Sequence, residues 1–103
     1  MSDENCRIIV KIDHELEDLM PQFMENTRKD IRSIDDAIFK KDMETVRRIG
    51  HSMKSYGSGY GFDEISALGK SIEAAALKAD VSLIRQTMNE LTNYLDQVMV
   101  TYD

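Results

Sequence analysis

The sequence predicts an all-α protein, an antiparallel up-down four-helix bundle. Apolar residues recur at three- and four-residue spacing through nearly the whole chain, as they do on the buried face of helices. The segments with this spacing are joined by connections of a few residues, which makes consecutive helices pack antiparallel. With 103 residues, 42% of them hydrophobic, the chain has the size of one domain with one core. We place an N-terminal segment at 1–12 and the bundle at 13–103.

The first expected helix runs from Asp13 to Lys40. Asp13 is a suitable N-cap, because its side chain can accept hydrogen bonds from the first backbone amides. Pro21 either kinks this helix or begins a separate one. The predicted buried face consists of Leu16, Leu19, Phe23, Thr27, Ile31, Ile34 and Ile38.

Three further helices are expected after the first. The second is capped by Asp42 and ends at the glycine-rich run 58–61, since glycine admits the backbone angles of a helix end. The third opens at Asp63, and the fourth is capped by Asp80 and continues to Tyr102. Their predicted apolar faces are Met43, Val46, Ile49, Gly50, Met53 and Gly57; Ile65, Leu68, Ile72, Ala75, Ala76 and Ala79; and Ile84, Met88, Leu91, Leu95, Val98 and Tyr102.

The composition excludes several classes of protein. A formal net charge of −6 argues against generic nucleic-acid binding, which depends on a basic surface. No apolar run approaches the roughly 20 residues of a membrane span, and none suits a secretion signal. The lone Cys6 cannot close an intrachain disulfide, which is typical of a reducing compartment. We therefore expect a cytoplasmic protein, and a monomer.

One histidine stands out in the second helix. At about 100° per residue, His51 lies roughly 130° away from the apolar face and should be exposed to solvent. Arg47, Arg48 and Lys54 stand within about one turn of it, and these cations favour a neutral ring with a free nitrogen lone pair. Such a ring is a competent nucleophile, and the same cations would offset the charge of an added phosphoryl group. On spacing alone, the pattern is also that of an ordinary solvated helix face.

The order of residues around His51 is more specific than their spacing. The run 50–62 resembles the signature of histidine-containing phosphotransfer (HPt) domains, in which lysine follows the phosphorylated histidine by three positions and glycine follows it by ten. Lys54 and Gly61 occupy those positions, and Gly57 and Ser58 supply the small residues between them. The pattern Leu68…Ile72-Glu73…Ala76 resembles the family's next helix.

This resemblance implies a phosphorelay intermediate rather than a stand-alone enzyme. His51 would be the phosphoacceptor, Lys54 would offset phosphate charge, and Arg47 and Arg48 would assist or steer the partner. The expected partners are a response-regulator receiver domain, a sensor histidine kinase, or both. The chain has no nucleotide or metal motif of its own, so no cofactor is expected on it, and the resemblance implies that the receiver brings the Mg²⁺ and the acidic pocket.

One departure from the family keeps alternatives open. The usual glycine after the lysine is Ser55 here, which adds a hydroxymethyl group beside the histidine. We expect Ser55, Gly57 and Ser58 to leave the approach to the ring open. The alternative is a helical adaptor that binds receiver or kinase domains without carrying phosphate, and the chain could also be a phosphoacceptor module of a larger kinase.

Other residues are weaker candidates for a site. His14 stands among acidic residues and is interpreted as surface, and two histidines far apart in the chain make no metal site. Tyr56 and Tyr60 could border an interaction surface, although packing at the helix end explains them equally well.

Overall fold

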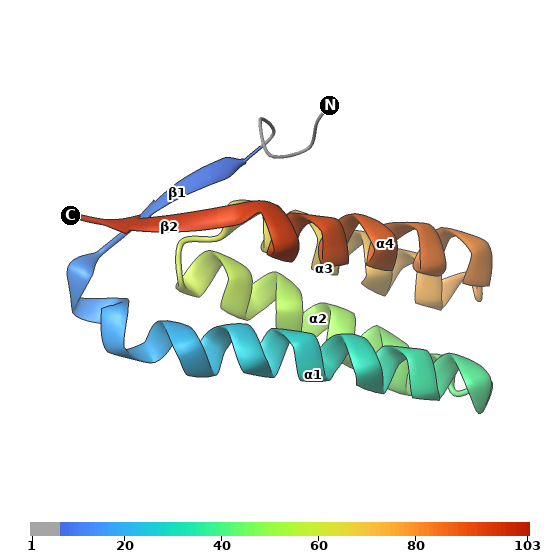
Figure 1. Ribbon diagram of the computed structural model, residues 1–103. Helices are drawn as coiled ribbons and strands as arrows, with labels where there is room; N and C mark the ends of the chain where they lie inside the picture. Colours follow the sequence, from blue (N-terminus) through green and yellow to red (C-terminus); the bar gives the residue numbers. More distant parts are fainter. Residues whose placement is uncertain (1–6) are drawn as a thin grey trace.

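The computed structural model describes residues 7–103, so Cys6 lies outside the described residues. Four antiparallel helices form the body of the molecule, and two short strands and a 3₁₀ helix lie at one end of it (Figure 1). In chain order the elements are β1 (Ile8–Ile12), η2 (His14–Leu19), α1 (Met20–Phe39), α2 (Met43–Gly59), α3 (Asp63–Leu77), α4 (Val81–Gln97) and β2 (Val98–Tyr102). The predicted all-α bundle is confirmed, with a small sheet added to it.

The α1–α2 and α3–α4 connections share one geometry. Lys41 and Ala79 each adopt a positive φ, of 59° and 53°, which ends the preceding helix. In each connection an aspartate follows directly and caps the next helix. Asp42 accepts a hydrogen bond from the Thr45 amide, and Asp80 accepts one from the Leu83 amide. The caps expected at these two aspartates are therefore confirmed, whereas Ala79 lies in the turn and not in the third helix.

The two ends of the described chain pair with each other. β1 and β2 form a parallel two-stranded sheet in the register Ile8↔Val98 to Ile12↔Tyr102. The expectation that the fourth helix continues to Tyr102 is therefore wrong, because α4 ends at Gln97. The β-branched and aromatic residues of 98–102 favour an extended chain once a partner strand is available. Residues 8–12, which the sequence analysis left outside the bundle, supply that partner, and Ile12 is only 2% exposed.

The first expected helix is two elements. Asp13 caps the 3₁₀ helix η2 by accepting a hydrogen bond from the Glu15 amide. Pro21 lies in the first turn of α1, so it begins a separate helix, where its missing amide hydrogen costs no hydrogen bond. Leu19, at the junction of the two elements, is 46% exposed, so its predicted burial is wrong.

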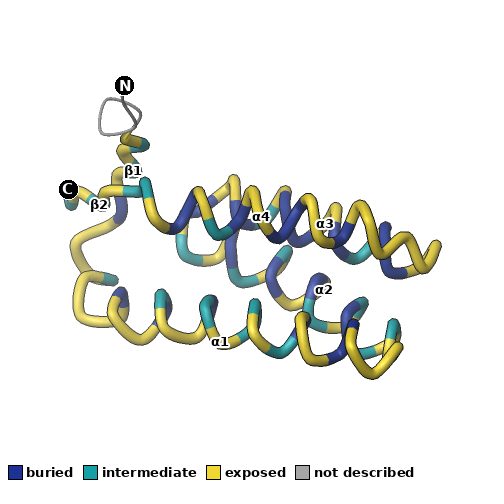
Figure 2. Tube along the Cα trace, turned by 45° about the vertical axis from the view of Figure 1, so that its right-hand side comes forward, coloured by how far each residue is buried: buried dark blue, intermediate teal, exposed yellow. Residues whose placement is uncertain are grey.

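The core runs along the middle of the bundle. Figure 2 shows the buried positions recurring along one side of each helix, with exposed positions on the outside. The least exposed large side chains come from every helix and from the α2–α3 turn, and they include Ile34, Met53, Phe62, Ile72 and Leu91. Phe62 stacks on Phe23 with ring centroids 4.9 Å apart, which ties the α2–α3 turn to α1.

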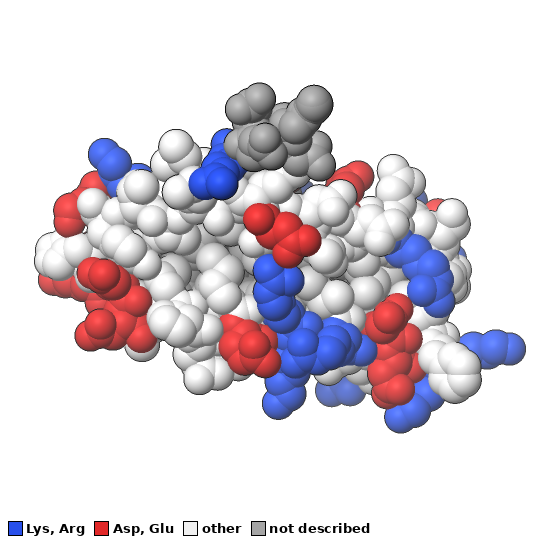
Figure 3. Space-filling view, in the orientation of Figure 1, with Lys and Arg blue, Asp and Glu red and all other residues white. Residues whose placement is uncertain are grey.

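The outer surface of α1 and α4 carries acidic and basic side chains side by side (Figure 3). Several of them form exposed ion pairs, including Arg28 with Asp96 and Arg85 with Asp35, both of which join α1 to α4. Within 7–103 no helix is long and apolar enough to cross a bilayer. The same residues contain no group of three or more His, Cys, Asp or Glu side chains arranged to hold a metal ion.

Candidate functional site

His51 lies midway along α2, on the side of the helix that faces solvent. Its neighbours Gly50 and Met53 face the interior, so the amphipathic pattern of α2 turns the imidazole outward. The His51 side chain is 57% exposed. The predicted orientation of this ring agrees with the structure.

A carboxylate from α3 holds one nitrogen of the ring. His51 Nδ1 lies 3.0 Å from Glu73 Oε2, and the other carboxylate oxygen of Glu73 lies 3.3 Å from Lys54 Nζ. Glu73 is the least exposed of the three, with 18% of its side chain accessible. Burial alone would raise the pKa of Glu73, but hydrogen bonds from His51 and Lys54 outweigh it and hold that pKa below its ordinary value. Glu73 is therefore ionised at neutral pH.

The charge of Glu73 determines which nitrogen of His51 carries the proton. An ionised carboxylate can only accept hydrogen bonds, so the nitrogen facing it is the protonated Nδ1. In the neutral ring the lone pair is then on Nε2, the nitrogen not engaged by Glu73. Nε2 is therefore the nucleophilic nitrogen of an exposed ring, and the hydrogen bond between Nδ1 and Glu73 fixes the orientation of that ring.

Close contact between α2 and α3 sets this geometry. A Cβ atom on Gly50 would lie 2.7 Å from the Glu73 amide nitrogen and 2.9 Å from the Gly69 carbonyl oxygen. A Cβ atom on Gly69 would lie 2.6 Å from the Lys54 amide nitrogen. Real side chains do not approach backbone atoms this closely, so both positions require glycine. The two glycines let the helices approach until Glu73 reaches His51.

The remaining cations are arranged differently from one another. Arg47 forms a bidentate ion pair with Glu44, which lies one turn earlier in α2. Arg48 is exposed and borders a shallow pocket between α1 and α2, together with Asp30 and Ser52. The sequence analysis expected only cations around His51, whereas the structure also places a carboxylate in contact with the ring.

The small residues divide into two groups. Ser55 and Ser58 are exposed, one and two turns beyond His51. Gly57 is buried instead, and a Cβ atom there would lie 2.5 Å from the Ser66 amide nitrogen of α3. Gly57 thus serves the contact between helices rather than clearance around the ring. Gly61 has a φ of +89° in the α2–α3 turn, two residues beyond the end of α2, where it permits the chain to reverse.

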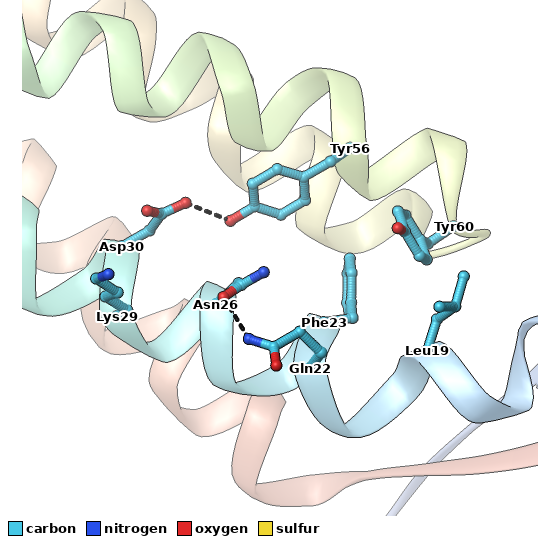
Figure 4. Close-up of a pocket in the computed structure, with 8 residues that line it drawn as sticks. All are labelled: Leu19, Gln22, Phe23, Asn26, Lys29, Asp30, Tyr56 and Tyr60. Atoms are coloured by element: carbon cyan, nitrogen blue, oxygen red, sulfur yellow. Dashed lines mark hydrogen bonds between the residues drawn. The ribbon is translucent and has the colours of Figure 1, made fainter.

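A groove between α1 and α2 lies on the other side of α2 from the His51–Glu73 contact, since Tyr56 and Tyr60 follow His51 by five and nine positions, about 140° and 180° around the helix. Its volume is about 490 Å³, and aromatic rings of Phe23, Tyr56 and Tyr60 line it together with the polar ends of Asn26 and Lys29 (Figure 4). The Tyr56 hydroxyl donates a hydrogen bond of 2.9 Å to Asp30 across the groove. Burial raises the pKa of Tyr56 above its ordinary value, so this hydroxyl keeps its proton and remains a donor.

The family of the chain follows from a comparison with protein-family models. The model described as Hpt domain matches residues 14–100, nearly the whole chain. The chain belongs to the Hpt domain family. No curated protein and no solved structure gives a significant match. Hpt domains act in histidine phosphotransfer in two-component signalling, where they interact with receiver domains and kinases.

Within this Hpt domain, Glu73 is the site residue that sequence reasoning missed. It was present in the pattern Ile72-Glu73 that resembles the family, but it was given no role. Spacing within α2 could not reveal it, because Glu73 is 22 positions from His51 and comes from another helix. The available signal was the pair of small residues Gly50 and Gly69, which indicates a close helix contact near the histidine.

Proposed function

We propose that His51 is the phosphoacceptor of this Hpt domain and exchanges a phosphoryl group with the aspartate of a receiver domain. The observation that carries the proposal is the contact between His51 Nδ1 and Glu73 in an otherwise exposed ring. A histidine of an ordinary solvated face has no need of a half-buried carboxylate that selects its tautomer.

In this reaction His51 Nε2 attacks the phosphorus of the receiver's aspartyl phosphate. The N–P bond forms as the P–O bond to the aspartate breaks, and the electron pair of that bond leaves with the receiver's carboxylate. The ring becomes positively charged as its lone pair is shared, and the negative charge of Glu73 stabilises that state through the Nδ1 hydrogen. The reverse step returns the phosphoryl group to a receiver aspartate.

Lys54 is the cation best placed to accompany the phosphoryl group. Its ammonium is already within reach of the site, because it is hydrogen-bonded to the same carboxylate as His51. A modest rotation of its flexible side chain would bring it to the phosphate oxygens. Arg48 is exposed and would attract the acidic pocket of a receiver, while Arg47 would first have to leave Glu44.

The receiver would dock over the face of α2 that carries His51, where Arg48, Ser52 and Ser55 are exposed. The receiver would bring the Mg²⁺ ion that neutralises charge at its own aspartate, and the Hpt domain would contribute the nucleophile and its positioning.

The first experiment measures phosphate uptake from a radiolabelled receiver. His51→Gln should abolish uptake while circular dichroism and thermal unfolding remain those of the parent. Glu73→Ala should slow uptake about tenfold or more, because the ring loses its fixed tautomer and orientation. His14→Gln is the matched control, since His14 is also exposed and should be dispensable. Undiminished labelling of the His51→Gln protein would refute the assignment.

The second experiment separates a phosphate carrier from an adaptor, the alternative that Ser55 keeps open. Phosphate on His51 should be labile in acid and stable in alkali. A protein that binds the receiver but never acquires phosphate of that kind would be an adaptor. The Ser55→Gly variant should transfer phosphate at least as fast as the parent, because it only removes a hydroxymethyl group from the approach.

A further inference from the structure

The two-stranded sheet leaves backbone groups without a strand partner. β1 and β2 are the only strands within 7–103, so each has one neighbour there and one open edge. The strand sequences are rich in β-branched residues and contain no proline, and Ile9 is 69% exposed. Edges of this kind readily add a further strand, and a two-stranded sheet on its own is marginal in water.

One hydrogen bond shows which groups of β1 face outward. The Ile12 carbonyl accepts a hydrogen bond of 3.2 Å from the Asp103 amide, so the backbone groups of Ile12 face β2. Groups alternate along a strand, and those of Ile8 and Val10 therefore face β2 as well. The N–H and C=O groups of Ile9 and Lys11 face the open edge.

We propose that the open edge of β1 pairs antiparallel with β1 of a second copy of this chain, centred on Val10. In this register Ile9 of each copy lies opposite Lys11 of the other. The outward groups of these two residues then exchange hydrogen bonds, as a narrow antiparallel pair requires. Val10 lies opposite Val10 of the second copy at the twofold axis, in a pair without mutual hydrogen bonds.

The charged residues in and beside β1 favour this register over the registers centred on Ile9 or Lys11. Centring on Val10 brings Arg7, which directly precedes β1, level with Asp13, which directly follows β1 in the other copy. A shift to a centre at Ile9 would oppose Arg7 to Lys11, and a centre at Lys11 would oppose two lysines. Like charges directly opposite are destabilising, whereas opposite charges stabilise. No comparable charge pairing arises along 98–102, which contains no charged residue.

The contacts of the two charged residues leave them available for this pairing. The Arg7 guanidinium donates only to the Met99 thioether, a weak acceptor, among the described contacts. Asp13 accepts a hydrogen bond from the Glu15 amide through one carboxylate oxygen, His14 Nδ1 lies 3.8 Å from that same oxygen, and the second oxygen remains for the pairing. Figure 1 shows β2 continuing α4 beyond the end of the helices, so antiparallel strands would direct the two bundles to opposite ends of the shared sheet.

Cysteine cross-linking in a Cys6→Ser background tests the register. Val10→Cys should form an intermolecular disulfide under mild oxidation, because Cα atoms of such a pair lie about 4.5 Å apart, within the range of a disulfide. Ile9→Cys should not, since its two copies would be offset by two residues and lie beyond about 7 Å. Random collisions would give the opposite order, because Ile9 is the more exposed residue. That order, or no cross-linking of Val10→Cys at about 1 mM protein, would overturn the proposal.

A charge variant tests the same interface without a cysteine. Arg7→Glu should weaken self-association in analytical ultracentrifugation about tenfold, because two attractive pairs become repulsive. Arg7→Lys keeps the charge and should associate like the parent. A parent protein that sediments as a monomer at every concentration, as expected from the sequence, would refute strand pairing. Phosphate uptake by each variant reports separately on His51.

Discussion

Replacing Gly50 by alanine tests the idea that helix proximity builds the site. The added methyl group would lie 2.7 Å from the Glu73 amide nitrogen and 2.9 Å from the Gly69 carbonyl oxygen. Ordinary contact begins near 3.4 Å, so α2 and α3 must separate locally by about 0.7 Å. Overpacking against backbone, which cannot rotate away, costs about 3 kcal/mol, and the better helix propensity of alanine returns about 1 kcal/mol. The free energy of unfolding should fall by about 2 kcal/mol.

For a domain of this size, that loss lowers Tm by about 10 °C. The same separation should stretch the 3.0 Å contact between His51 and Glu73, so phosphate uptake should slow at temperatures where the variant is still folded. Gly59→Ala is the matched control, because a Cβ atom there meets nothing within 4 Å. Thermal unfolding of both variants measures whether only Gly50→Ala lowers Tm. If Gly50→Ala were as stable as Gly59→Ala, close packing of the helices would not be what requires glycine.

Three further predictions concern the turn, the sheet and the site. Ala79→Gly should raise the free energy of unfolding by up to about 1 kcal/mol, because glycine adopts a positive φ without strain, whereas Ala75→Gly inside α3 should lower it in the same denaturant titration. Ile12→Ala should cost about 2–4 kcal/mol and Ile9→Ala less than about 0.5 kcal/mol, since only Ile12 is buried; equal effects would show that β1 is not part of the core. Glu73→Gln should lower Tm at neutral pH, and because the pKa of Glu73 is lowered by folding, the difference from the parent should shrink as pH falls from about 4.5 through the folded-state pKa; a difference that persisted at pH 2 would contradict the charged interaction.

The helices could be predicted because their signals are local. Asp42 and Asp80 stand directly before apolar residues at helical spacing, and both cap helices in the structure. The strands could not be recognised in the same way. Val98 and Tyr102 continue the apolar series of α4, and only the distant segment 8–12 makes them part of a strand. Tertiary pairing therefore decided the conformation at both ends of the chain.

The same contrast between local and long-range signals applies to the candidate site. The exposure of His51 could be predicted, because both the ring and the apolar face that it opposes belong to α2. Glu73 could not be assigned, since no rule of spacing connects residues on different helices. The partner of Lys54 was equally hidden, because its carboxylate comes from α3. The ion pair of Arg47 with Glu44, three positions earlier in the same helix, is by contrast a local signal.

The parallel strands also bear on the order in which the molecule assembles. They join segments about 90 residues apart, near the maximum for this chain. Closing so long a loop in an unstructured polypeptide costs about 4 kcal/mol of entropy, whereas each helical hairpin needs only a short turn. The helices should therefore condense first and bring the termini together, so that the sheet is the last element to form and the first to open. Backbone amides of β1 and β2 should accordingly exchange with deuterium sooner than those in the middle of α2 and α3.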